Sequence, residues 1–134
     1  MKVDGSCHCG RVTYRAEIDP EKVGMCNCTD CQKLSGTAFQ TLALVPQEKL
    51  EFTGEQPKTY KKTGDSGNVR VQGFCGHCGS PIYATSADDS PKVYALRLGS
   101  MNQRQSLQPK FQLWHRSAFP WVAQVSEIPA KDQQ

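Results

Sequence analysis

The sequence has no long hydrophobic run. Its first ten residues, MKVDGSCHCG, reach charged residues and cysteine before any apolar segment can form. A signal peptide needs an apolar stretch of about 7–15 residues, and a membrane-spanning helix needs about 20. We therefore expect neither a leader nor a membrane partner. The expected location is cytoplasmic, where free thiols persist.

Aromatic side chains are few, at 8% of residues, and basic residues are scattered apart from Lys58, Lys61 and Lys62. Nucleic-acid binding usually needs a basic patch, often interleaved with aromatic residues. The formal net charge of +3 gives little support, because seven thiolates around two zinc ions would bring it to zero. We expect no nucleic-acid partner, and we interpret the three lysines as the solvated edge of a strand.

Short segments with alternating apolar residues dominate the chain, and turn residues separate them. In RVTYRAEI, one face of a strand would carry Val12, Tyr14, Ala16 and Ile18. The similar segments are TAFQTLALV, EKLEF, NVRVQGF, PIYAT, KVYALRL, FQLWH and WVAQV. The pattern predicts a mainly β fold of predominantly antiparallel sheets, with about eight strands and one or two short helical turns.

One short segment is predicted to be helical, with Asp30 as its N-cap and Gly36 as its end. The 134 residues fit one domain, which we place at residues 1–128. Residues 129–134, PAKDQQ, are expected to form a C-terminal tail. The aromatic residues of LWHRSAFPW are expected to close the core over the sheets.

Cysteine is the residue that the sequence has in excess, with seven in three groups. These groups read C-x-C in SCHCG, C-x-C-x-x-C in CNCTDC, and C-x-x-C in FCGHCGS. An odd number excludes a complete set of disulfides within the chain, and two four-cysteine iron–sulfur clusters would need eight. Zinc accepts three or four thiolates and fits better.

The spacing permits two groupings. In the first, the outer pairs form a closed site and the middle group keeps three ligands. The four-cysteine cluster then comprises Cys7, Cys9, Cys75 and Cys78. The three-cysteine cluster comprises Cys26, Cys28 and Cys31, which leave a fourth position for water or substrate, as in catalytic zinc sites. In the second grouping, a zinc ribbon uses Cys28, Cys31, Cys75 and Cys78. Spacing alone favours neither grouping strongly. A third interpretation is that one C-x-x-C segment is a redox-active cysteine pair, but the βαβ pattern that usually surrounds such a pair is missing.

The cysteine segments resemble the glutathione-dependent formaldehyde-activating enzymes, a family that includes centromere protein V-like members. The matching segments are GSCHCGRVTY, CNCTDCQKLSGTAF, FCGHCGSPIY, LGSMNQ and HRSAFPWV, from about residue 5 to about residue 122. The resemblance implies a β-tent-like fold of packed antiparallel sheets that is stapled by zinc. It also implies the first grouping, with structural zinc in the four-cysteine cluster and catalytic zinc in the three-cysteine cluster.

A zinc ion held by three thiolates carries a net charge of −1 and is a weak Lewis acid, so hydrolysis fits it poorly. Exchange with a substrate thiol fits better, because the bound thiol stays deprotonated below its usual pKa of about 8.5. The expected reaction is addition of a thiolate to a small aldehyde, or the reverse cleavage of the carbon–sulfur bond. The resemblance supplies glutathione, formaldehyde and S-(hydroxymethyl)glutathione. We therefore predict a zinc-dependent carbon–sulfur lyase. The alternative is a non-catalytic zinc-binding module of the same fold that engages protein or nucleic acid.

Several other residues are candidates for the site. Lys33 follows the three-cysteine cluster and could attract a carboxylate of glutathione. The arginines that could do the same are Arg97, Arg104 and Arg116, and the sequence does not choose between them. His8 and His77 lie within cysteine motifs, but we interpret them as non-ligands because sulfurs already complete that site. His115 is a candidate proton shuttle.

Overall fold

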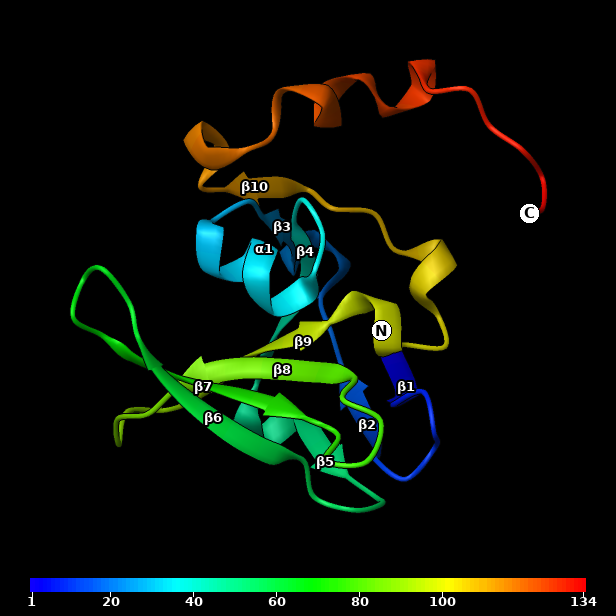
Figure 1. Ribbon diagram of the computed structural model, residues 1–134. Helices are drawn as coiled ribbons and strands as arrows, with labels where there is room; N and C mark the ends of the chain where they lie inside the picture. Colours follow the sequence, from blue (N-terminus) through cyan, green and yellow to red (C-terminus); the bar gives the residue numbers. More distant parts are fainter.

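The computed structural model describes residues 1–134 and shows a mainly β fold built from two sheets (Figure 1). The three-stranded sheet has the order β1-β2-β5, and the seven-stranded sheet has the order β10-β3-β4-β9-β8-β7-β6. The strands are β1 (Lys2–Ser6), β2 (Thr13–Glu17), β3 (Val23–Cys26), β4 (Gln40–Pro46), β5 (Leu50–Phe52), β6 (Lys58–Thr63), β7 (Val69–Phe74), β8 (Pro81–Ser86), β9 (Val93–Arg97) and β10 (Phe111–Leu113). All pairings are antiparallel except β10 with β3, which is parallel. The prediction of a mainly β fold is confirmed, with mixed rather than purely antiparallel sheets.

Helical structure is limited to one short α-helix and six 3₁₀ segments. The α-helix is α1 (Thr29–Ser35), and Gly36 ends it with a φ of 70°, as predicted. The 3₁₀ segments are η1 (Pro20–Lys22), η2 (Gln47–Lys49), η3 (Leu98–Ser100), η4 (Arg104–Ser106), η5 (His115–Ser117) and η6 (Pro120–Glu127). Asp30 was the wrong N-cap, because the Sγ of Cys28 accepts the hydrogen bond from the N–H of Cys31 instead.

Seven of the eight predicted strand segments contain a strand. The exception is WVAQV, which lies in η6, because Pro120 at its start lacks an N–H and fixes a helical φ. Three strands, β1, β3 and β6, were not predicted from the alternation of apolar residues. The sequences of β1 and β3, KVDGS and VGMC, contain glycine, and β6 is polar throughout. That last strand lies at the edge of the larger sheet. Lys58 and Lys61 are exposed there, as we interpreted them, but Lys62 is half-buried and pairs with Asp30, so the interpretation of a solvated edge was wrong for Lys62.

The main core lies between the two sheets. One face of β2 and its flanks is buried as predicted, through Val12, Tyr14, Ala16 and Ile18. From Tyr14, aromatic contacts continue across the core through Phe52 and Tyr83 to Tyr94, with successive ring centroids 6.4, 5.8 and 4.9 Å apart. Packing of this kind fixes the smaller sheet against the larger one, which leaves the opposite face of the larger sheet for α1 (Figure 1).

The segment after β10 does not close the core. Trp114 and Trp121 are each 48% exposed, and Phe119 is also exposed, so the prediction of aromatic core closure was wrong. In Figure 1 this orange segment crosses above β10, away from the interface of the two sheets. Residues 129–134 are exposed and belong to no helix or strand, while the domain boundary at residue 128 stays a prediction. No helix of the structure has the length and apolar character needed to cross a membrane.

The backbone at Gly5 lies too close to neighbouring atoms to accommodate a side chain. A Cβ at this position would overlap the hydroxyl end of Tyr14 and the backbone oxygen of Ser100. We expect Gly5→Ala to lower the free energy of unfolding by about 1–3 kcal/mol, because the backbone oxygen cannot move aside cheaply. Urea denaturation measures this change. Gly99→Ala is the control, since nothing lies within 4 Å of its Cβ position, and an equal effect at both sites would contradict the argument.

Candidate functional site

The structure gathers the seven cysteines into the first of the two groupings. The sulfurs of the four-cysteine cluster all lie within 4.8 Å of one another, and so do those of the three-cysteine cluster. Within the larger cluster, the Sγ atoms of Cys7 and Cys9 are 3.5 Å apart and those of Cys9 and Cys75 are 3.7 Å apart. Four sulfurs at about 2.3 Å from a tetrahedral zinc would be about 3.8 Å apart. The spacing of these donors therefore fits a metal ion of that size.

Two turns build the four-cysteine cluster. Cys7 and Cys9 lie beyond the end of β1, in the turn that follows this strand. Cys75 follows β7 in a second turn, which Gly79 closes by donating its N–H to the carbonyl of Cys75 at 2.9 Å. Gly79 has a φ of 75°, a conformation in which other residues are strained. Two turns, rather than two strand faces, thus direct the sulfurs toward one point.

Donor groups surround the sulfurs of this cluster. The N–H of Val12 donates to the Sγ of Cys7 at 3.3 Å, and the N–H of His77 donates to the Sγ of Cys75 at 3.4 Å. The hydroxyl and N–H of Ser80 lower the pKa of the Cys78 thiol to about 5. Such donors stabilise thiolates and are typical of the surroundings of structural metal sites.

The three-cysteine cluster lies where β3 meets α1. Cys26 is the last residue of β3, Cys28 caps α1, and Cys31 lies in the first turn of the helix. Between them, buried Asn27 holds the loop against β10: its N–H donates to the carbonyl of Leu113 at 3.0 Å and its Nδ2 donates to the same oxygen at 3.2 Å. The geometry of this cluster is therefore fixed by β10, which comes from the other end of the chain.

Three thiols this close cannot all ionise without a cation. The pKa of Cys26 is lowered to about 6, chiefly because the thiol of Cys31 donates to it. The pKa of Cys31 is raised, chiefly by that same hydrogen bond to Cys26 and by burial. At the start of the helix, the N–H of Cys31 donates to the Sγ of Cys28. A bound cation would offset the repulsion between the ionised thiols and stabilise all three thiolates together.

A cavity of about 210 Å³ adjoins the three-cysteine cluster. Its apolar wall is formed by Leu34, Leu42, Leu44, Ala84, Ala95 and Leu113. Its polar lining, besides the three cysteines, consists of Lys62, Arg70, Gln72 and Arg97. No carboxylate lines the cavity, so three cations face a group of sulfurs whose ionised form is negative. Of these three cations, only Arg97 was a predicted candidate for the site. Lys62 was interpreted as part of a solvated strand edge, and both Lys62 and Arg70 reach the site from the distant hairpin of β6 and β7.

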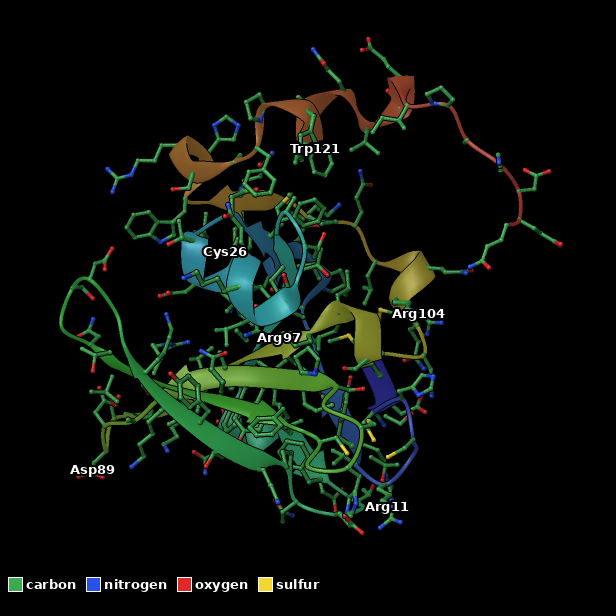
Figure 2. The ribbon with its side chains drawn as sticks, viewed as in Figure 1. Arg11, Cys26, Asp89, Arg97, Arg104 and Trp121 are labelled. Atoms are coloured by element: carbon green, nitrogen blue, oxygen red, sulfur yellow. The ribbon has the colours of Figure 1, made fainter.

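Arg97 lies at the end of β9, below α1 and Cys26 in Figure 2. It is only 6% exposed, and its Nη2 donates to the Oε1 of Gln72 at 2.9 Å. Burial lowers its pKa to about 10, and the negative charge of the cysteines opposes this shift, so the guanidinium is charged at neutral pH. Its Nε has no hydrogen-bond partner. A buried charge of this kind belongs to a site rather than to the core.

A second groove, of about 380 Å³, lies beside Cys28 at the start of α1. There Lys62 forms an ion pair with Asp30, which ties the β6–β7 hairpin to the helix. Arg116 stacks over the ring of Trp114, with 4.8 Å from its Cζ to the ring centroid. Lys62 and Arg116, two of the cations of this groove, thus already interact with other side chains of the protein.

The remaining candidates lie away from the three-cysteine cluster. Lys33 is exposed and lines neither the cavity nor the groove beside that cluster, so its role stays a prediction. His77 contacts Glu55, with 3.0 Å from Nε2 to Oε2, rather than the sulfurs. His8 and His115 are exposed, and neither belongs to a cysteine cluster.

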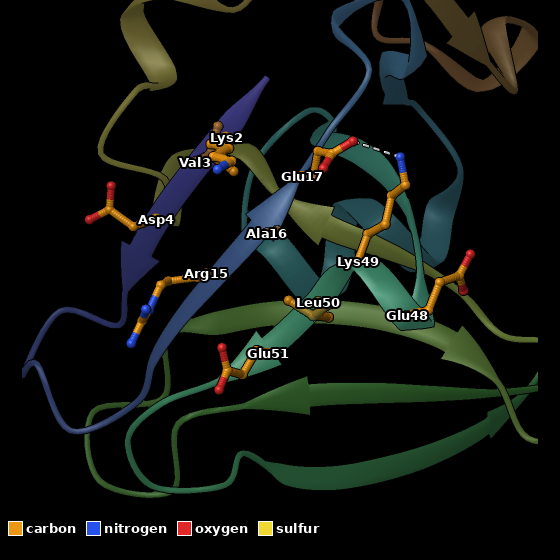
Figure 3. Close-up of a pocket in the computed structure, with 10 residues that line it drawn as sticks. All are labelled: Lys2, Val3, Asp4, Arg15, Ala16, Glu17, Glu48, Lys49, Leu50 and Glu51. Atoms are coloured by element: carbon orange, nitrogen blue, oxygen red, sulfur yellow. Dashed lines mark hydrogen bonds and ion pairs between the residues drawn. The ribbon is translucent and has the colours of Figure 1, made fainter.

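Another cavity, of about 600 Å³, lies along β1, β2 and β5 (Figure 3). Its lining contains no cysteine, and the Nζ of Lys49 lies 2.7 Å from the Oε1 of Glu17. This ion pair is drawn as the dashed line in Figure 3. We interpret the region as solvated surface whose charges are already matched, because it offers no reactive group.

Comparison with known proteins agrees with this architecture. Residues 2–117 match the glutathione-dependent formaldehyde-activating enzymes, and the chain belongs to this family, whose members act on formaldehyde and glutathione. A crystal structure of a Rhodobacter sphaeroides protein is similar to the chain with a TM-score of 0.61 and 19% sequence identity. The likeness covers 81% of this chain and 98% of that one, and it concerns the fold.

Proposed function

We propose that the protein is a zinc-dependent carbon–sulfur lyase that forms and cleaves the adduct of a thiol with a small aldehyde, S-(hydroxymethyl)glutathione in the case of glutathione and formaldehyde. The observation that carries this proposal is the three-cysteine cluster beside a cavity lined by three cations and no carboxylate. Family membership supports the choice of glutathione and formaldehyde. The cytoplasmic location predicted from the sequence belongs to the same proposal.

The two clusters would divide structure and chemistry between two zinc ions. Cys7, Cys9, Cys75 and Cys78 would hold one ion in a closed site, because four sulfurs complete its tetrahedron. Cys26, Cys28 and Cys31 would hold the other. Zinc at that open cluster would supply a position where a substrate thiol is kept as a thiolate at neutral pH.

The residues around the three-cysteine cluster would stabilise the negative charges that develop during the reaction. In the synthetic direction, the thiolate sulfur attacks the carbonyl carbon; the carbon–sulfur bond forms while the π pair moves to oxygen, which then takes up a proton. In the lytic direction, the hydroxyl loses that proton and the carbon–sulfur bond breaks. Lys62, Arg70 and Arg97 would stabilise the anionic thiolate and the developing oxyanion. The leucine wall would keep bulk water from weakening these interactions.

The test is the rate of adduct formation between glutathione and formaldehyde, followed by NMR, with zinc-loaded protein and with no protein. We expect acceleration above the spontaneous rate, together with two zinc ions per chain by elemental analysis. Protein that holds two zinc ions, is folded and gives only the spontaneous rate would remove this function and favour the non-catalytic binding module. Salt-dependent retention on DNA would then indicate the nucleic-acid form of that alternative.

A further inference from the structure

A third cavity lies on the other side of Arg97 from the three-cysteine cluster. It has a volume of about 530 Å³, and polar residues form most of its lining, among them Gln40, Ser80, Arg97, Asn102 and Arg104. Arg97 lines both this cavity and the one beside the cysteines. The two cavities are therefore separated by about one side chain. Figure 2 labels both arginines, Arg97 at the end of β9 and Arg104 in η4.

The charge of this third cavity is unbalanced. Its lining includes two arginines and no aspartate or glutamate, and the one thiol in it is that of Cys7, from the four-cysteine cluster. Neither Arg97 nor Arg104 forms an ion pair anywhere in the structure. Arg104 is held in place by a hydrogen bond from its Nη1 to the carbonyl of Met101 at 3.0 Å, which leaves its other donors free. A cavity of this kind attracts anions, and arginine matches the two oxygens of a carboxylate.

Two buried polar groups of this cavity also lack partners. Gln40 is 5% exposed, and its Oε1 accepts no hydrogen bond; the Nε of Arg97 donates none. Buried polar atoms of folded proteins are nearly always paired, since an unpaired one costs about 1–3 kcal/mol. Both atoms are inaccessible to solvent, so a ligand in the cavity would reach them only if the side chains turned toward it.

We propose that this third cavity binds the terminal carboxylate of the thiol substrate through Arg97 and Arg104. The inference rests on the proposed function, because that function places the substrate sulfur at the three-cysteine cluster. The sulfur of glutathione is on its middle residue, so it lies within about 7 Å, or two residues of extended chain, of the terminal carboxylate. Arg97, which lines both cavities, is the side chain that this span has to pass. The enzyme would thus select peptide thiols with a free C-terminal carboxylate over small neutral thiols. Of the three arginines that the sequence left equal, the structure favours Arg97 and Arg104.

The first test is binding of S-methylglutathione to the zinc-loaded protein by calorimetry. This probe has the peptide carboxylates but no free thiol, so its binding does not depend on catalysis. We expect Arg104→Gln to weaken binding about tenfold or more, since a hydrogen bond to a charged group is lost, and Arg104→Lys to weaken it less. The matched control, Arg116→Gln, removes an arginine from the groove beside Cys28 and is expected to bind as the wild type does. Circular dichroism checks that each variant is folded.

The second test compares thiols in the reaction with formaldehyde. Arg104→Gln is expected to raise the KM for glutathione about tenfold and to leave the rate with 2-mercaptoethanol unchanged. Wild-type affinity of Arg104→Gln for S-methylglutathione would overturn the inference, and so would loss of binding in Arg116→Gln alone. Acetate that binds as tightly as S-methylglutathione would also overturn it, because the cavity would then be a site for free carboxylates. A protein that binds the probe through Arg104 but does not accelerate the reaction would support the cavity and contradict only the proposed function.

Discussion

Replacing Cys75 by serine is expected to unfold most of the protein at ordinary temperature. Cys75 is fully buried, and its sulfur belongs to the cluster that joins the turn after β1 to the turn after β7. A structural zinc contributes about 10–16 kcal/mol in small zinc domains, while the net stability of a domain is only about 5–15 kcal/mol. Loss of one of four ligands is therefore enough to remove most of the folded population. Thermal unfolding followed by circular dichroism measures it.

The neighbouring His77 provides the control. It lies inside the same C-x-x-C segment, but its side chain faces Glu55, and only its backbone N–H contacts the cluster. His77→Ala keeps that N–H and removes an exposed contact, so we expect a change of less than about 1 kcal/mol. If Cys75→Ser were as stable as His77→Ala, the four-cysteine cluster would not be a structural metal site.

Replacing Cys31 by serine is expected to abolish activity while the fold survives. The three-cysteine cluster lies at the start of α1 and joins the helix to β3, whereas the sheets are held by a separate core. Two remaining thiolates bind zinc weakly, so we expect the zinc content to fall from two ions to one. The acceleration of adduct formation should fall by about 10³-fold or more, since the substrate thiol loses its binding position. Elemental analysis, circular dichroism and the NMR rate assay measure the three effects.

Lys33→Gln on the exposed side of the same helix is the control for Cys31→Ser. It should keep both zinc ions, because Lys33 is exposed and belongs to neither cluster. A rise in KM for glutathione in this variant would support the predicted role of Lys33 as a substrate contact. A Cys31→Ser protein that retained two zinc ions and full activity would show that the chemistry does not take place at this cluster.

Much of the architecture follows from local patterns in the sequence. Alternation of apolar residues located β2 and six other strands, because burial of one sheet face requires a period of two. The alternation did not predict β3 or β6, because glycine, cysteine and lysine in these strands interrupt the period of two. It also failed for WVAQV, because Pro120 favours a helical turn whatever the pattern of the following residues.

The number and spacing of the cysteines were enough to predict clusters of potential metal ligands, since an odd set of seven thiols suits neither disulfides nor paired iron–sulfur clusters. The choice between the two groupings was decided by tertiary structure, because the turns after β1 and β7 meet only when the sheets assemble. Tertiary structure also decided where the cations lie. Lys62, Arg70 and Arg97 come from three different strands and Arg104 comes from η4, and only the assembled fold places them around the three-cysteine cluster and the neighbouring cavity.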